Sequence, residues 1–345
     1  MAAVDPGLPL SRRRFVLGAG AAGLGLLVGC GRLPGQGQTP AKAARIGILA
    51  PVPAPATATE PEYPEALRQG LHDFGYVEDQ NIFLDWRFSE GRNDLAAGLA
   101  VELAHVPVDL IIAFGTPAAL AARQATTTIP IVVPLCVDPV GSGLVASLAR
   151  PGGNVTGLAV NLAELSGKRL QLLKEISPGL TRVGVLWNPD NIDPAAQWRE
   201  LQAAAPVLDV RLYSLEVHSP IELGSAFEAA TQRQVDALFT LGDPLTAIVL
   251  RERILEFAST RRLPAMYDQR LFPDAGGLVS YGPNIREQVR RAAYYVDRIL
   301  KGTQPAVRPL EQPRAYELAI NLRTAQSLRL TIPHHVLLQA TEVIQ

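Results

Sequence analysis

The sequence predicts an α/β protein with two Rossmann-like lobes, each built on a parallel sheet. Short apolar, β-branched segments alternate regularly with segments of helical periodicity, which is the pattern of parallel strands covered by helices on both faces. A set of three short motifs occurs twice in the same order. The chain has 345 residues, of which 48% are hydrophobic, too many for one small domain and enough for two sizeable cores.

The expected elements follow in order along the chain. Strands are predicted at 45–49, 82–88, 109–114, 131–135, 155–160, 182–187, 210–215, 237–241, 264–267, 278–281 and 316–321. Helices are predicted between them at 62–74, 93–105, 118–124, 141–148, 165–176, 194–207, 221–233, 245–260 and 285–300. Each helix connects two strands, so that most neighbouring strands should run parallel.

The repeated motifs indicate two copies of one α/β unit. In each copy a strand beginning Arg-x-Gly-x-Leu is followed by a Val-Asp strand that ends in Gly, a polar residue and Pro, and then by a Pro-initiated strand. Chance gives one such match easily, but three in the same order favour a duplication. The paired segments are 45–49 with 182–186, 108–117 with 235–244, and 129–131 with 263–265.

The first 29 residues have the features of an export signal. Ser11-Arg12-Arg13-Arg14-Phe15 precedes an uncharged apolar run that ends at Gly29 and is too short to span a bilayer. This order resembles the twin-arginine signal, and the run ends in Leu-Val-Gly-Cys30, which resembles the bacterial lipobox. We therefore expect a lipid on Cys30, although Cys30 could instead simply close an ordinary signal peptide. Residues 30–44 then form a flexible tether.

Several function classes are excluded by composition and position. Removal of residues 1–29 takes away three Arg and one Asp, so the net charge moves from −1 to −3, which is unlike a nucleic-acid binder. The Gly18–Gly23 segment matches a dinucleotide fingerprint but lies inside the export signal, so no cofactor is expected. Cys136 would be the only remaining thiol, which excludes an internal disulfide and a Cys-based metal site.

Candidate ligand-binding residues lie where the predicted strands end, because ligands of open α/β sheets bind outside the carboxyl ends of the strands. Two such sheets facing each other would form a cleft. The candidates are Gly115, Thr116, Asp138, Trp187, Asn188, Asp243, Tyr267 and Tyr281, with Asp268 directly after Tyr267.

Some of these residues have two interpretations. Gly115 allows a backbone N–H to approach a ligand. Thr116 and Asp243 each precede a Pro that suits a first helical turn, so both are placed as N-caps. Capping could be their whole role. Alternatively, Thr116 receives a ligand carboxylate at the helix N-terminus and Asp243 pairs with an ammonium group.

The same ambiguity holds for the other candidates. Asp138 lies before a Pro-Val-Gly segment and has the same choice between capping and charge pairing. Trp187 and Tyr281 could stack on an aromatic or apolar ligand, or pack within the lobe cores. Asn188 before Pro189 could bind ligand or form a turn.

The sequence does not favour an enzyme. None of the five His residues has metal-ligand spacing with another ligand type. The Gly141-Ser142-Gly143 segment is not the five-residue nucleophile elbow. We therefore expect neither catalytic nor metal-binding residues.

One long segment, Pro130 to Gly157 with Asp138-Pro-Val-Gly-Ser-Gly-Leu-Val-Ala-Ser-Leu-Ala-Arg-Pro-Gly-Gly-Asn-Val-Thr-Gly157, resembles the ABC-importer substrate-binding family that includes tryptophan-binding lipoproteins. The resemblance covers about residues 45 to 343. Further matching segments are 69–78, 115–119, 165–169, 185–189, 276–282 and 299–302. The Pro-rich loop at 51–61 departs from the family pattern, which leaves a tryptophan-like specificity open.

The resemblance implies a type I periplasmic binding protein, with two lobes joined by a hinge of three crossovers. Lobe 1 is then expected at 45–160 plus 277–305, and lobe 2 at 161–276 plus 306–345. The implied function is capture of a small organic ligand, such as an amino acid or an aromatic compound, and its delivery to an ABC permease. The protein would be monomeric, bind no nucleic acid, and be anchored by Cys30 in the periplasm or at the cell surface.

Three other functions are compatible with parts of the sequence. The same fold can present ligand to a signalling receptor, and the chain does not separate this from transport. A cytoplasmic regulator would need an N-terminal DNA-reading helix pair where the export signal stands. An exported α/β enzyme would need a catalytic constellation that the sequence does not show.

Overall fold

The computed structural model describes residues 43–52 and 62–345. The predicted export signal, Cys30 and most of the predicted tether and Pro-rich loop lie outside these residues. The described part forms one compact unit that contains two sheets. Among the described residues, no helix is long and apolar enough to cross a membrane.

The first sheet is parallel throughout and has the strand order β2-β1-β3-β4-β5. Its strands have the buried, β-branched composition that parallel sheets require. They are β1 (Ala44–Ala50), β2 (Ile82–Phe88), β3 (Leu110–Ala113), β4 (Ile131–Cys136) and β5 (Val155–Ala159).

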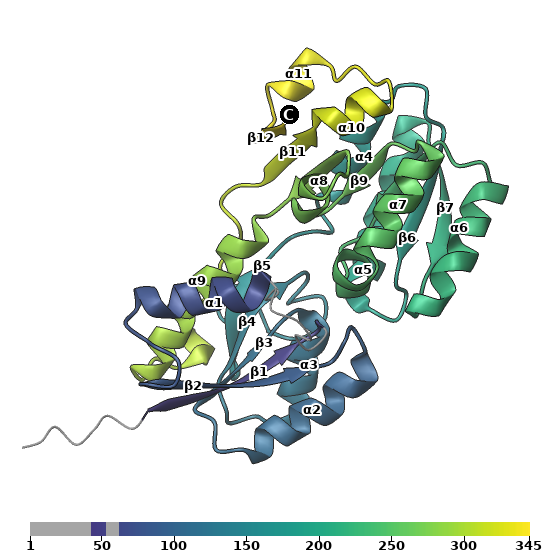
Figure 1. Ribbon diagram of the computed structural model, residues 1–345. Helices are drawn as coiled ribbons and strands as arrows, with labels where there is room; N and C mark the ends of the chain where they lie inside the picture. The colour runs from purple at the N-terminus through teal and green to yellow at the C-terminus, as the bar shows by residue number, and fades with distance from the viewer. Residues whose placement is uncertain (1–42, 53–61) are drawn as a thin grey trace, which may run out of the picture. The chain divides into compact units, whose positions relative to one another are not determined.

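Helices cover both faces of this sheet (Figure 1). On one face α1 (Glu62–Asp73) and α9 (Ile285–Leu300) pack side by side, although they are more than 200 residues apart in sequence. On the other face α2 (Asn93–His105) and α3 (Thr116–Ala125) pack their alanine-rich sides together. Small side chains permit this close approach, and the two faces bury separate apolar clusters.

The second sheet has the order β12-β11-β10-β9-β8-β6-β7. Its strands are β6 (Arg182–Trp187), β7 (Arg211–Glu216), β8 (Ala237–Thr240), β9 (Ala265–Tyr267), β10 (Val279–Gly282), β11 (Glu317–Asn321) and β12 (Glu342–Ile344). All neighbours are parallel except β10 and β11. These two are antiparallel because the chain leaves the sheet after β10, forms α9 on the first sheet, and returns.

The helices around the second sheet also lie on both of its faces, where they enclose two further apolar clusters. They are α4 (Ser166–Ile176), α5 (Ile192–Ala204), α6 (Leu223–Gln232), α7 (Arg251–Arg261), α8 (Leu271–Asp274), α10 (Leu322–Ser327) and α11 (His334–Leu337). Short 3₁₀ turns form at 205–208, 220–222 and 305–307, and a π-helical turn at 245–249 precedes α7.

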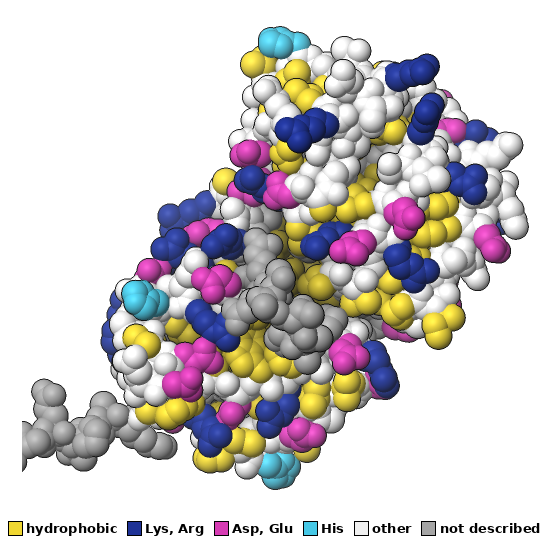
Figure 2. All heavy atoms as spheres, in the orientation of Figure 1, with side chains coloured by type: hydrophobic (Ala, Val, Ile, Leu, Met, Phe, Trp, Pro, Cys, Tyr) yellow, Lys and Arg dark blue, Asp and Glu magenta, His cyan; other side chains and the backbone are white. Residues whose placement is uncertain are grey.

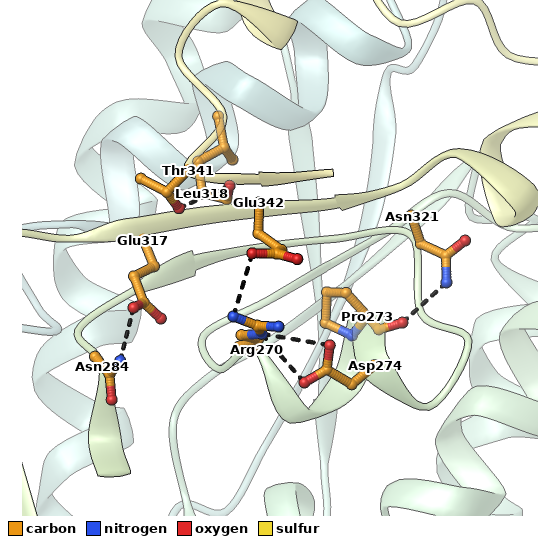
Figure 3. A network of polar contacts seen from close by, with 9 residues as sticks. All are labelled: Arg270, Pro273, Asp274, Asn284, Glu317, Leu318, Asn321, Thr341 and Glu342. Carbon is orange, nitrogen blue, oxygen red and sulfur yellow. Dashed lines mark hydrogen bonds and ion pairs between the residues drawn. The ribbon is translucent and has the colours of Figure 1, made fainter. Parts of the chain in front are cut away.

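The end of the chain completes the second sheet. β12 pairs with β11, and Thr341 donates a side-chain hydrogen bond to the carbonyl of Leu318 at 3.1 Å. Arg270 forms an ion pair with Glu342 at 3.5 Å and another with Asp274 at 3.2 Å (Figure 3). This strand was not predicted, because three residues of mixed polarity carry too little pattern to identify it.

The α/β class with two sheets is confirmed, and two of the sequence expectations need correction. Residues 141–148 form turns, not a helix. Asp138 Oδ1 accepts a hydrogen bond from the Gly141 N–H at 2.7 Å, and Gly143 has φ 71°, so this segment takes turn geometry. The expected boundary at 277 also shifts, because residues 279–282 belong to the second sheet and only α9 packs on the first.

The three expected crossovers are present. The chain passes between the sheets at 160–165, at 283–284, and along 301–316. In the last of these, the Glu311 N–H donates to the Gly157 carbonyl at 3.0 Å.

Candidate ligand-binding site

Between the two sheets lies a cavity of about 60 Å³, formed by residues at the carboxyl ends of their strands. This is room for about two water molecules, so a larger ligand requires the two sides to separate. The first side contributes Tyr63, Phe114, Gly115, Leu135 and Val137, and the second contributes Leu162, Asp193, Gly242, Asp243, Asp268 and Gln269.

Gly115 and Thr116 connect β3 to α3 at this cavity. Gly115 has φ 85°, a conformation that side chains other than glycine rarely adopt. Thr116 is fully buried, and its hydroxyl accepts a hydrogen bond from the Val137 N–H at 3.2 Å. The prediction that Thr116 is the N-cap is wrong: Gly115 occupies that position without a side-chain bond, since the Thr116 hydroxyl is directed to the end of β4.

Asp193 reaches the N-terminus of α3 from the opposite side of the cavity. It lies in the first turn of α5. Burial raises the pKa of its carboxyl to about 7, with further increases from the charges of Asp243 and Asp138. The hydroxyl and backbone N–H of Thr116 act in the other direction and favour the carboxylate. The helix N-terminus therefore faces a carboxyl group that the protein itself supplies and that is mainly ionised only above about pH 7.

Asp243 is held by two donors. Asn191 Nδ2 donates to its Oδ2 at 2.6 Å, and the Leu245 N–H donates to its Oδ1 at 2.7 Å. The second bond is the capping interaction that the sequence predicted. Burial raises the pKa of Asp243 to about 6, against the effect of these hydrogen bonds.

Asp268 follows β9, and its carboxylate accepts fewer hydrogen bonds than that of Asp243. Gln269 Nε2 donates to its Oδ2 at 3.2 Å, whereas its Oδ1 has no hydrogen-bond partner in the described chain. Burial raises the pKa of Asp268, and the positive charge of Arg169 acts in the opposite direction. A Cβ on Gly242 would lie 2.7 Å from Asp268 Oδ2, so Asp268 requires glycine at that position.

Arg169 supports the strand end from behind the cavity. Its Nη2 donates to the Leu162 carbonyl at 3.0 Å and to Gln197 Oε1 at 3.1 Å. Gln197 in turn bonds both the N–H and the carbonyl of Gly242, at 3.0 Å and 3.2 Å. Burial lowers the pKa of Arg169 to about 10. This network fixes the Gly242 backbone beside the carboxylates.

Two stacked aromatic rings form the apolar wall. The Tyr63 and Phe114 centroids are 6.0 Å apart with an interplanar angle of 6°. The Tyr63 hydroxyl donates to Gln269 Oε1 at 3.3 Å, which joins α1 to the opposite side of the cavity. The cavity therefore combines aromatic surface with buried carboxylates.

The predicted site residues separate into two groups. Gly115 and Asp243 line the cavity, and Thr116 lies directly beside it. The remaining candidates are not among the cavity-lining residues. They are Asp138, Trp187, Asn188, Tyr267 and Tyr281.

Their local contacts explain this placement. Trp187 stacks on Trp198 with centroids 5.6 Å apart, and its Nε1 donates to Ser214 Oγ at 2.8 Å. Tyr267 stacks on Phe272 within the core. Tyr281 packs beside the core against Tyr316.

The two remaining polar candidates make turns. Asp138 bonds the Gly141 N–H, and the Oδ1 of Asn188 accepts from the Asp190 N–H at 3.0 Å.

Sequence reasoning missed Tyr63, Phe114 and Asp193. Phe114 was assigned to the end of a strand and Tyr63 to a helix, and neither was proposed to bind ligand. Asp193 lies several residues beyond the end of β6, in α5, so a rule based on the residue after a strand does not find it. The one available signal was the Asn191-Ile-Asp193-Pro194 sequence, which is typical of a helix start.

On the face drawn in Figure 2, acidic and basic side chains are interspersed. Within residues 43–52 and 62–345, no group of three or more His, Cys, Asp or Glu side chains is arranged to hold a metal ion.

Comparisons with known proteins agree with this geometry. Residues 45–344 match the family model described as ABC transporter substrate binding protein. The chain is 26% identical over 317 residues to the tyrosine-binding protein of Clostridioides difficile (strain R20291), with 90% of each chain covered.

Two solved structures are similar over most of this chain. The ABC domain from Streptococcus pneumonia in complex with L-Trp has 27% identity and a TM-score of 0.78, covering 87% of this chain and 99% of that one. A conserved domain protein from Vibrio cholerae has 28% identity and a TM-score of 0.79, covering 88% and 100%.

Proposed function

Since this chain belongs to the ABC transporter substrate-binding protein family, we propose that it is a lipid-anchored receptor whose ligand site is the cavity lined by Gly115, Asp243 and Asp268. The family captures small molecules outside the cytoplasm for ABC importers. The two sides of the cavity close around the ligand, and the closed receptor then delivers the ligand to a membrane permease. The protein binds and releases its ligand without bond chemistry.

The observation that carries this proposal is the position of the cavity. It lies at the carboxyl ends of both sheets, where open α/β folds bind ligands. The stacked Tyr63 and Phe114 rings suit an apolar or aromatic body, and the carboxylates suit a polar group. Relatives named for tyrosine and solved with L-Trp support a ligand of amino-acid size. The ligand class proposed is an amino acid or a related small organic compound.

The anchor is proposed from the sequence. The Leu-Val-Gly-Cys30 segment follows an uncharged apolar run, and a diacylglycerol on Cys30 would retain the mature protein at the membrane. The location is then the periplasm or the cell surface. A tether of about 14 residues between Cys30 and β1 would keep the receptor close to its permease.

Native mass spectrometry of the purified mature protein tests the function, because a co-purified small molecule appears directly as added mass. Calorimetry against a panel of amino acids and related compounds follows. The Asp243→Ala variant should bind this compound at least about tenfold more weakly than the wild type, because the Asp243 carboxylate lines the cavity. Absence of any bound or titratable small molecule would contradict the proposed function, and unchanged affinity in Asp243→Ala would contradict the site assignment.

A further inference from the structure

The charges around the cavity are strongly unbalanced. Asp193, Asp243 and Asp268 all line it, and they are only 6%, 4% and 1% exposed. Arg169 is the one Lys or Arg among the buried residues of the described chain. It is not among the lining residues, and its Nη2 donates hydrogen bonds to Leu162 and Gln197. One buried guanidinium, whose charge acts on Asp268, stands against three buried carboxyl groups. Buried carboxylates in excess of their cations are costly.

The Oδ1 atom of Asp268 marks where a donor is missing. Asp268 is 99% buried and lines the cavity, and this oxygen has no hydrogen-bond partner in the part of the chain that is described. Asp243 differs, because Asn191 and Leu245 donate to both of its oxygens. A carboxylate that lines a cavity and keeps one buried oxygen without a hydrogen bond is suited to an N–H donor from a ligand.

The position that would receive a ligand carboxylate is already used. The N-terminus of α3 is an anion-binding element at this cavity, and Asp193 faces the hydroxyl and N–H of Thr116 there. A second carboxylate would have to displace Asp193 and would lie close to Asp243. Repulsion between such charges at short range disfavours it.

The opposite wall is aromatic. The parallel Tyr63 and Phe114 rings line the same cavity, and aromatic faces attract cations as well as apolar groups. Taken with the carboxylates, they favour an ammonium group attached to an apolar body.

We propose that the cleft selects a cationic organic amine that carries no carboxylate, and that Asp268 is the main partner of its ammonium group. This rests on the proposed function and names the ligand class of the same site. The amine neutralises one of the three buried charges, supplies the donor that Oδ1 of Asp268 lacks, and leaves Asp193 on the α3 N-terminus.

Matched compounds test this selection. Each of three series combines one apolar group with an amine, an amino acid and an acid, in that order. The series are tryptamine, L-tryptophan and indole-3-propionate; phenethylamine, L-phenylalanine and 3-phenylpropionate; and pentylamine, L-norleucine and hexanoate. Calorimetry on the mature wild-type protein should show at least one amine binding about tenfold or more tightly than its amino acid, with no binding of the acid. An amino acid or acid that binds at least as tightly as its amine overturns the inference and leaves the proposed function standing. Failure of all three amines also overturns it.

Variants locate the ammonium group. Asp268→Asn should weaken the amine at least about tenfold, whereas Glu228→Gln, an exposed change on α6, should leave affinity unchanged. Equal affinity in both variants overturns the role of Asp268. Failure of every compound here, together with no added mass in native mass spectrometry, would overturn the inference and would also count against the proposed function.

The pH dependence of wild-type binding gives a readout that needs no variant. Asp193 lies near Asp138 and Asp243, and Asp268 lies near Arg169 and Asp243. Raised pKa values of about 7 for Asp193 and about 6 for Asp243 mean that both groups are mostly protonated at pH 5.5. The amine stays charged throughout this range, so its affinity should rise about tenfold from pH 5.5 to 8.0. Constant or falling affinity overturns the inference.

Discussion

The carboxylate of Asp236 accepts hydrogen bonds from the backbone N–H of Arg182 at 2.9 Å and from its guanidinium Nη2 at 2.8 Å. In the other sheet, Asp109 Oδ2 accepts from the Arg45 N–H at 2.7 Å. Both aspartates thus hold the start of the neighbouring strand. Corresponding strands also lie in the same order, β2-β1-β3-β4 in one sheet and β7-β6-β8-β9 in the other.

Replacing Asp236 with Asn should therefore lower stability near neutral pH. Burial opposes ionisation of Asp236, but hydrogen bonds from Arg182 and Thr181 outweigh it and lower the pKa to about 2. The folded pKa lies below the unfolded value, so the stabilisation is present above about pH 4 and is lost as the pH falls through about 2. Because the pair is partly exposed, we expect a loss of about 1 kcal/mol. Urea unfolding at pH 7 and pH 3 measures it, and a larger loss at pH 3 would contradict the prediction.

The hydroxyl of Thr116 supports a second prediction. Thr116→Val keeps the shape but removes the acceptor of the Val137 N–H, which leaves a buried donor unsatisfied. The free energy of unfolding should fall by about 1–3 kcal/mol. Thr116→Ser retains the hydroxyl and is the matched control, with a loss of about 1 kcal/mol for the missing methyl. An unfolding free energy for Thr116→Val equal to that of the wild type would show that the hydroxyl contributes nothing.

Asp193 predicts an opposite dependence of stability on pH. Its folded pKa of about 7 lies above the ordinary value of 3.8, so the folded state binds the proton more tightly than the unfolded state. Stability should fall as the pH rises from about 4 to 7 and level off above that. Asp193→Asn should remove this decline and be more stable than wild type at pH 8 by about 2 kcal/mol. Parallel melting profiles of the two proteins from pH 4 to 8 would refute this.

The anchor gives a prediction in cells. Cys30→Ser should remove the site of lipidation and move the protein from the membrane fraction to the soluble extracytoplasmic fraction. Arg12→Lys combined with Arg13→Lys should leave the uncleaved precursor in the cytoplasm. Cell fractionation and the mass of the mature N-terminus measure both outcomes. Normal export of the double Lys variant would indicate the general secretory route and would leave the proposed lipid on Cys30 unaffected.

Most of the fold could be predicted because the strands are short, buried and regularly spaced. The Val-Asp motifs at 108–109 and 235–236 occupy equivalent positions in the two sheets. The failure at 141–148 has a local cause. Its apolar spacing resembles a helix, but the Gly141 N–H is bonded to Asp138, and Gly143 has positive φ. Turn chemistry therefore overrides periodicity there.

The site was only partly predictable, because sequence gives the position of a strand end but not the direction of each side chain. Trp187 and Asp243 were both predicted to bind ligand because each lies at the carboxyl end of a predicted strand. Trp187 packs on Trp198 on the core side, whereas Asp243 faces the cavity. Asp193 and Tyr63 come from helices that reach the cavity only after the two sheets are placed together. Such tertiary proximity has no signature in a single sequence.

The three passages of the chain between the sheets have a consequence for proteolysis. A cut in the last of them, at 301–316, leaves the two lobes covalently joined by the other two passages, which both lie on the larger fragment, while the smaller fragment stays paired with β10 through β11. A nicked protein should therefore elute from a sizing column as an intact particle and separate into two bands only under denaturing conditions. Protease resistance measured on denaturing gels alone would underestimate how long the receptor survives.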